Sequence, residues 1–216
     1  MIAPIRRVFA AIAVLATLFL AFGARADEAA DEAADAADAQ TFIRTLADRA
    51  LVLVNARDMK DAARAEGFRT LFVEAFDIPD IGRFVLGRHW KGATPEQQQD
   101  FLKSFEDYTV LTWSTRFKDY SGVSLDVLGA SPADGGYLIV QSRIVRAQGD
   151  PLGVGWRVHK VDDKWKITDI LIENVSMALT QRQDFSAVVQ SSGGTVDGLL
   201  VTMHKKIEEL RTAQAN

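Results

Sequence analysis

Side chains able to support catalysis or to bind a metal are few in this sequence and lie far apart. The three histidines, His89, His159 and His204, have no second ligand at a spacing that metal sites use. The sequence has no cysteine, no H-E-x-x-H motif, no G-x-S-x-G turn and no glycine-rich phosphate loop. We therefore expect no catalytic residues, no metal site and no cofactor.

One enzymatic alternative stays open. Acid–base chemistry of the ketosteroid isomerase kind requires a carboxylate base and tyrosine donors in an apolar pocket. Asp169 with Tyr108 or Tyr137 could supply these groups, provided that they converge in the fold. An apolar cavity without such a pair would instead favour a carrier of apolar ligands. A scaffold or adaptor with a filled core is a third alternative.

The N-terminus has the pattern of an export signal. Arg6 and Arg7 precede an apolar run over residues 8–22, and an A-x-A cleavage sequence ends at Ala26. The run is shorter than the roughly 20 residues that a membrane-spanning helix requires. We therefore predict that residues 1–26 are a signal peptide that is cleaved after Ala26.

Residues 27–39 contain only alanine, aspartate and glutamate, which predicts a flexible, partly helical and solvated tether. The chain has a formal net charge of −4, and six of its carboxylates lie in this tether. The remaining body is close to neutral. Because nucleic-acid binding requires a basic surface, we expect no nucleic-acid partner.

Apolar residues at helical spacing predict helices over residues 40–55, 58–75, 80–86, 95–121, 179–190 and 195–212. Asp80 is the expected cap of the third helix, and Gly87 its end. Thr94 and Gln97 form a predicted capping box, with Pro95 in the first turn. The helix that they open carries an aromatic stripe of Phe101, Phe105 and Tyr108.

From residue 123 the apolar period changes to two, which predicts four strands near residues 123–127, 138–144, 152–158 and 165–172. Turn residues separate the strands, so we expect an antiparallel meander. One face of such a sheet can be covered by helices, and the predicted fold class is α+β.

Two stretches resemble the MlaC family of periplasmic phospholipid-binding proteins, which are also described as toluene-tolerance proteins. The first covers residues 84–97 and continues to Phe101 and Phe105; the second covers residues 165–177 and continues to Arg182 and Phe185. The resemblance spans roughly residues 40–212. Where the family usually has glycine before Val-Ser, this chain has Asn174, which tolerates a positive φ. The hopanoid-associated HpnM branch shares the fold, so the identity of the lipid stays open.

The resemblance implies a conical lipid-binding domain over residues 40–213, with a twisted sheet of four or slightly more strands wrapped by about six helices around a deep apolar cavity. It implies a periplasmic carrier with bound phospholipid as cargo. The partners implied are an inner-membrane ABC transporter complex and an outer-membrane lipoprotein–porin complex, in a system that maintains outer-membrane lipid asymmetry.

The candidate cavity residues are apolar or aromatic side chains from both halves of the body, each of which could instead be ordinary core: Phe84, Phe101, Phe105, Tyr108, Trp156, Val158, Ile170, Ile172, Val175 and Met177. Arg182 could hold a lipid phosphate at the cavity mouth, because arginine presents a planar fork of donors. The alternative for Arg182 is an ion pair with Asp169 or Glu173.

Overall fold

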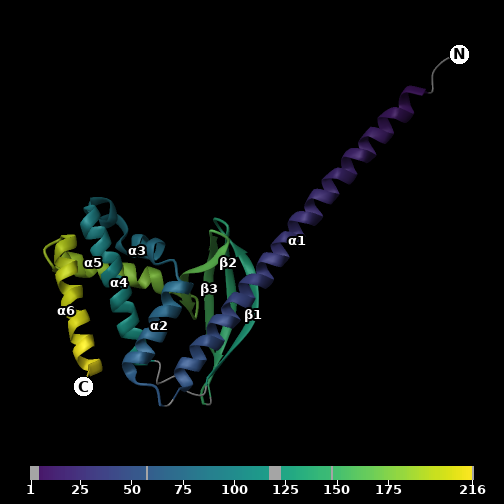
Figure 1. The fold of residues 1–216 in the computed structure, drawn as a ribbon. Coiled ribbons are helices and arrows are strands. Elements are labelled where there is room, and N and C mark those ends of the chain that lie inside the picture. Colours follow the sequence, from purple (N-terminus) through teal and green to yellow (C-terminus); the bar gives the residue numbers. More distant parts are fainter. Residues whose placement is uncertain (1–4, 57, 117–122, 147, 216) are drawn as a thin grey trace. The chain divides into compact units, whose positions relative to one another are not determined.

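The computed structural model describes residues 5–56, 58–116, 123–146 and 148–215 (Figure 1). The chain divides into two compact units, Met1–Asp38 and Ala39–Asn216. Helix α1 (Ile5–Asn55) runs through the boundary between them. Within the described residues, no helix combines the length and the apolar character needed to cross a membrane.

The predicted tether, residues 27–39, is helical along its whole length, and its side chains from Ala30 to Asp38 are mostly exposed. From the sequence we expect a segment that is only partly helical. The difference follows from composition, because alanine has the highest helix propensity of all residues.

The fold of the described residues is α+β, with six α-helices and a five-stranded sheet. After α1, the helices are α2 (Asp61–Ala75), α3 (Ile78–Leu86), the 3₁₀ helix η1 (Gly87–Gly92), α4 (Pro95–Arg116), α5 (Met177–Ser191) and α6 (Val196–Ala215). All six predicted helical segments are confirmed. The predicted end of the fourth, near residue 121, lies outside the described residues.

The start of α3 differs from the prediction. Asp77, not Asp80, caps this helix, and its carboxylate accepts the Asp80 backbone N–H at 3.1 Å. Pro79 lies in the first turn. Backbone N–H groups have no partner within the helix there, so the missing N–H of proline costs no helical hydrogen bond. Gly87 ends the helix with φ +58°, as predicted.

Helix α4 begins with the predicted capping box. The Gln97 backbone N–H donates to Thr94 Oγ1 at 3.2 Å, and the Thr94 N–H donates to Gln97 Oε1 at 2.8 Å. These two hydrogen bonds satisfy donors that the first helical turn leaves free.

An ion network connects α2, α4 and α6. Arg69 of α2 bonds Asp107 at 2.6 Å and also contacts Glu106, and Arg211 of α6 bonds Asp107 at 2.9 Å. Burial lowers the pKa of Arg69, but hydrogen bonds to Asp107 and Glu106 and their charges outweigh that effect, so the pKa is raised. The network fixes three helices around one partly buried carboxylate.

The strands are β1 (Ser124–Ala133), β2 (Tyr137–Val145), β3 (Leu152–Val161), β4 (Lys164–Ile172) and β5 (Val175–Ser176), paired antiparallel in that order. The four predicted strands are confirmed, and the fifth has only two residues. The β4–β5 turn places Glu173 and Asn174 at φ 48° and 64°, which confirms the positive φ expected at Asn174. Two residues of positive φ fit the right-handed twist of a hairpin.

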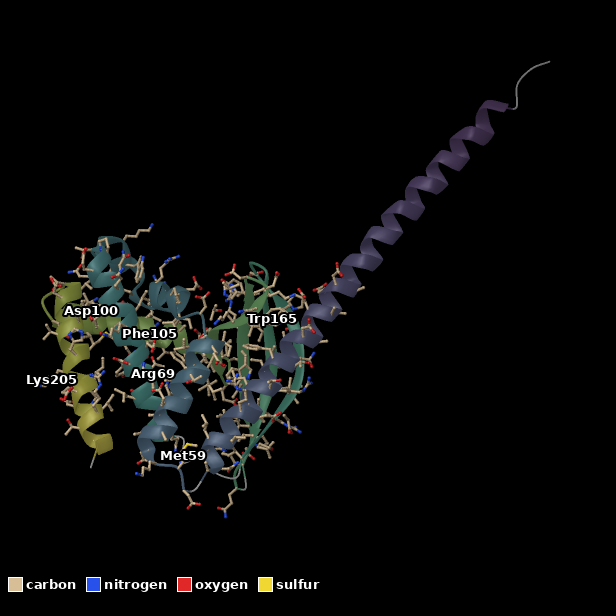
Figure 2. The ribbon with its side chains drawn as sticks, viewed as in Figure 1. Met59, Arg69, Asp100, Phe105, Trp165 and Lys205 are labelled. Carbon is tan, nitrogen blue, oxygen red and sulfur yellow. The ribbon has the colours of Figure 1, made fainter. Side chains whose placement is uncertain are left out.

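Two apolar clusters form the core of the body. One lies among the helices and includes Phe101, Phe105 and Phe185. The other joins one sheet face to Ile43 of α1 and includes Val158. Figure 2 labels Phe105 among the helices and Trp165, which packs against the second cluster, on the sheet. Phe76 packs against both clusters.

Candidate functional site

Four of the candidate residues share one sheet face. Trp156 of β3 pairs with Ile170 of β4, Val158 with Ile167 and Val154 with Ile172. Since side chains alternate across a strand, Trp156, Val158, Ile170 and Ile172 point to the same side. This is the face that carries the second apolar cluster.

The burial of these four side chains is unequal. Val158 is 0% exposed and is completely surrounded by protein. Trp156, Ile170 and Ile172 are only partly buried. Part of the apolar surface of Trp156, Ile170 and Ile172 is therefore left uncovered on this sheet face.

Trp156 is held by a hydrogen bond that sequence reasoning missed. Its indole N–H donates to Ser142 Oγ at 2.9 Å, and the buried Ser142 hydroxyl donates to the Val154 carbonyl at 2.9 Å. The sequence feature that could have indicated this bond is Ser142, a single polar residue at an inward-facing position of an otherwise apolar strand. The bond satisfies the polar atom of the indole and leaves its apolar ring free for packing.

The aromatic stripe of α4 packs against α5. The Phe185 ring centroid lies 5.6 Å from that of Phe101, 6.2 Å from that of Phe105 and 6.4 Å from that of Tyr108. Phe101 is 0% exposed and Phe105 5%. In this structure these rings therefore form helix–helix core, and their contact with lipid stays a prediction.

The remaining candidates lie elsewhere. Phe84 is 41% exposed and Val175 is 55% exposed, while Met177, the first residue of α5, is partly buried. The Arg182 guanidinium stacks over the Phe84 ring, 5.1 Å from its centroid. The structure thus separates the candidates into a sheet group, a helix group and a surface group, rather than bringing all of them together.

The ion pair considered for Arg182 is absent from the described structure. The Asp169 carboxylate accepts Ser176 Oγ–H at 2.5 Å and the Ala178 N–H at 2.9 Å. The Glu173 carboxylate accepts the Gly153 N–H at 2.6 Å. Both carboxylates therefore stabilise backbone turns.

The residues of the enzyme alternative have separate partners. Asp169 stabilises the start of α5, Tyr108 packs near Phe185, and Tyr137 stacks on His159 at 5.1 Å. The hydrogen bonds described for Asp169 do not include a tyrosine hydroxyl. Among the described residues, no group of three histidine, aspartate or glutamate side chains could hold a metal ion.

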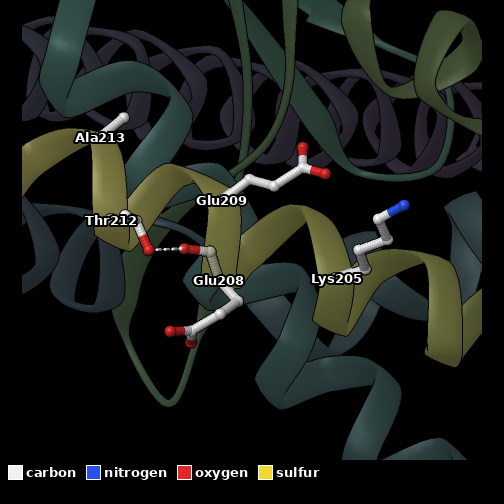
Figure 3. Close-up of a pocket in the computed structure, with 5 residues that line it drawn as sticks. All are labelled: Lys205, Glu208, Glu209, Thr212 and Ala213. Carbon is white, nitrogen blue, oxygen red and sulfur yellow. Dashed lines mark hydrogen bonds between the residues drawn. The ribbon is translucent and has the colours of Figure 1, made fainter.

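A hollow with a volume of about 590 Å³ lies on α6, and Figure 3 shows the residues that line it. Lys205, Glu208, Glu209, Thr212 and Ala213 line it, and the Thr212 hydroxyl donates to the Glu208 carbonyl at 2.9 Å. It is open and bordered by charged side chains, and it includes none of the candidate cavity residues. It is therefore not the apolar cavity that sequence analysis predicted, and that cavity stays a prediction.

Comparison with known proteins identifies relatives of this chain. The family model described as "MlaC protein" matches residues 44–205. The toluene tolerance protein ttg2D of Pseudomonas putida is 21% identical over 122 residues, 56% of this chain and 57% of that protein. The intermembrane phospholipid transport system binding protein MlaC of Haemophilus influenzae is 22% identical over 132 residues, 59% of this chain and 61% of that protein. The chain thus aligns with about three fifths of the length of each curated relative.

A solved structure has the same fold. The phospholipid-binding protein from Ralstonia solanacearum, determined in complex with a phospholipid, superposes with a TM-score of 0.69 at 24% identity. The match covers 80% of this chain and 98% of that chain. It therefore includes both the sheet and the helices of the body.

Proposed function

Because this chain belongs to the MlaC family, we propose that it is a periplasmic phospholipid-binding carrier. Its cargo moves between an outer-membrane lipoprotein–porin complex and an inner-membrane ABC transporter complex. The observation that carries the proposal is the match of almost the whole Ralstonia solanacearum chain, which was solved with a phospholipid bound. The name of the Haemophilus influenzae relative, a binding protein of intermembrane phospholipid transport, supports the same role.

The acyl chains are proposed to lie on the sheet face that carries the second apolar cluster, at the part that other elements leave uncovered. Trp156, Ile170 and Ile172 present partly exposed apolar surface there, beside the fully buried Val158. A well-packed core leaves little apolar surface of this kind. Trp156 pairs with Ile170, and Ile172 lies two residues further along β4 on the same face, so the three side chains form one apolar strip against which methylene groups can pack.

The energetics require such a protected site. Each methylene group moved into water costs about 0.8 kcal/mol. Two acyl chains of about 15 methylenes each would therefore cost on the order of 24 kcal/mol to expose. A carrier that buries the tails needs few specific contacts with the headgroup, because the tails provide most of the binding free energy.

Lipid extraction tests this proposal. Protein purified under native conditions should yield phospholipid when it is extracted with organic solvent and measured by mass spectrometry. The headgroup identified would separate a phospholipid carrier from the hopanoid-associated alternative. Protein that is folded but free of lipid, and that takes up none from phospholipid vesicles, would refute the carrier function.

A further inference from the structure

Phe76 lies where the two apolar clusters of the body meet. It packs against the first cluster, among the helices, which includes Phe72, and against the second cluster, on the sheet, which includes Ile167. Its ring centroid is 4.6 Å from that of Phe72. Phe72 is 4% exposed and Ile167 0%, whereas Phe76 is only partly buried. The Phe76 side chain therefore lies between two well-packed groups of side chains and is less enclosed than its neighbours.

The backbone at Phe76 is held by a helix and by the sheet. The Phe76 N–H donates to the Phe72 carbonyl at 2.9 Å, at the end of α2. Phe76 forms a parallel bridge with Ile167 of β4, and the Asp77 N–H donates to the Ile167 carbonyl at 2.9 Å. The Asp77 carboxylate lies 3.0 Å from His159 Nε2 of β3. A new side chain at residue 76 should therefore change the volume at this point without moving the corner between α2 and α3.

The proposed lipid strip runs along β4 toward this corner. Ile172 and Ile170 are partly buried, whereas Ile167 is 0% exposed. The register between β3 and β4 skips Thr168, and this bulge brings Ile170 and Ile167 to the same face. Ile167 belongs to the second cluster, and Ile170 packs against it. The uncovered strip therefore ends where Phe76 pairs with Ile167.

We propose that the Phe76 ring limits the length of the acyl chain that the strip holds. This inference rests on the proposed carrier function, because it requires the tails to lie on this sheet face. Ile172 pairs with Val175, which is 55% exposed, so this end of the strip is the one nearer to water. A chain that enters there passes Ile170 and then meets the Phe76 ring. Each methylene that the protein buries raises affinity about fourfold, so the position of the limit decides which chain lengths are preferred.

A change in the size of this side chain should move the limit. Without the Phe76 ring, the space between the two clusters is lined by apolar side chains. An apolar space of this kind stays dry and accepts apolar groups. In Phe76→Ala, the end of a longer acyl chain should therefore fill it. In Phe76→Trp, the larger ring should meet the chain sooner.

Competition between two phospholipids tests the proposal. Each protein is loaded from detergent micelles that contain equal parts of dipalmitoleoyl- and dioleoyl-phosphatidylglycerol, whose chains differ by two methylene groups. After affinity capture, mass spectrometry gives the ratio of the two lipids bound. Phe76→Ala should raise the ratio of the longer to the shorter lipid about 15-fold relative to the wild type, because two further methylenes of one chain leave water. Phe76→Trp should lower this ratio.

The micelles hold the longer lipid equally strongly in every experiment, so the comparison between variants isolates the contribution of the protein. Phe68→Ala is the matched control. Phe68 is another partly buried phenylalanine of α2, its ring lies 6.1 Å from that of Phe72, and it packs against the first cluster rather than the second. Phe68→Ala should keep the wild-type ratio, even where its thermal unfolding shows a loss of stability.

A second variant keeps the test decisive if the alanine variant does not fold. Phe76→Leu is a smaller change that keeps an apolar side chain, and it should shift the ratio in the same direction by a smaller factor. A wild-type ratio in the folded Phe76→Ala or Phe76→Leu protein would overturn the proposal. An equal shift in Phe68→Ala would overturn it as well, because the effect would then not belong to the end of the strip.

The lipid content of the wild type separates this inference from the carrier function. A wild type that is purified without phospholipid, and that takes up none from the micelles, refutes the carrier function itself. A wild type that holds phospholipid, with the same ratio in every folded variant, refutes only the role of Phe76.

Discussion

Substitution of Ile172 by arginine tests the proposed lipid strip most directly. Ile172 pairs with Val154 on β3 and with Val175 on β5, on the same face as Trp156. It is partly buried at the end of β4, so an arginine can lie along apolar surface while its charge stays within reach of water. The fold should therefore survive the change.

The loss of lipid-binding free energy in Ile172→Arg follows from the number of acyl methylene groups that no longer pack on the strip. A hydrated guanidinium on the strip prevents an acyl chain from packing there. If about four methylenes return to water, binding weakens by about 3 kcal/mol. This corresponds to a dissociation constant about 200-fold larger.

The assay measures phospholipid per protein after purification, together with retention of a fluorescent phospholipid during dilution. Thermal unfolding shows whether each variant is folded. Val201→Arg is the control, because it places the same charge at a position on α6 that is 68% exposed. A folded Ile172→Arg variant with the lipid content of the wild type would show that the tails do not lie on this strip.

Three further substitutions test how the body is held together. Thr94→Ala should lower the free energy of unfolding by about 1 kcal/mol. It should also raise the pKa of Glu96 in an NMR titration, because hydrogen bonds from the Glu96 backbone and the Thr94 hydroxyl hold that pKa low. Gly87→Ala should cost about 2 kcal/mol in urea unfolding, since φ is +58° there. Asp107→Asn should cost about 2 kcal/mol, because it leaves the partly buried Arg69 without its main anionic partner.

Matched changes serve as controls for these variants. Gly92→Ala should be nearly neutral, because nothing lies within 4 Å of an added Cβ and no positive φ is required. Glu208→Gln should also be nearly neutral, since this side chain is 73% exposed and 4.0 Å from Arg211. Equal losses in a control and its test variant would contradict the role given to the test residue.

The pH dependence of the Glu96 contribution has a definite sign. The folded-state pKa is lowered, so the charged form is favoured by folding. The contribution is therefore present above the ordinary carboxyl pKa and disappears as the pH falls through the lowered value. In Thr94→Ala this acid dependence should weaken, which a series of unfolding curves at different pH would measure.

The sequence alone determined the features that depend on neighbours in the chain. The capping box of Thr94 and Gln97 and the four strands of the meander follow from local stereochemistry. The positive φ at Asn174 follows from the resemblance to a family that usually has glycine there. Each of these features involves only residues that are close together in the chain, so the amino-acid sequence is enough to predict it.

Only the tertiary structure decided how similar residues are used. Phe84 and Phe101 are equally apolar, yet one is 41% exposed and the other 0%. The Phe185 ring of α5 packs against Phe101, whereas Phe84 has only the Arg182 guanidinium of α5 described over its ring. The burial of a side chain depends on which segments, distant in the sequence, pack against it. The local pattern of residues does not show which segments these are.

The partners of polar groups were decided in the same way. Arg182 meets the Phe84 ring instead of a carboxylate, and the Trp156 indole meets Ser142, fourteen residues earlier. Each contact joins separate elements and requires their relative placement to be known. The sequence could name the side chains with the right chemistry, but the packing of helices on the sheet determined which of them meet.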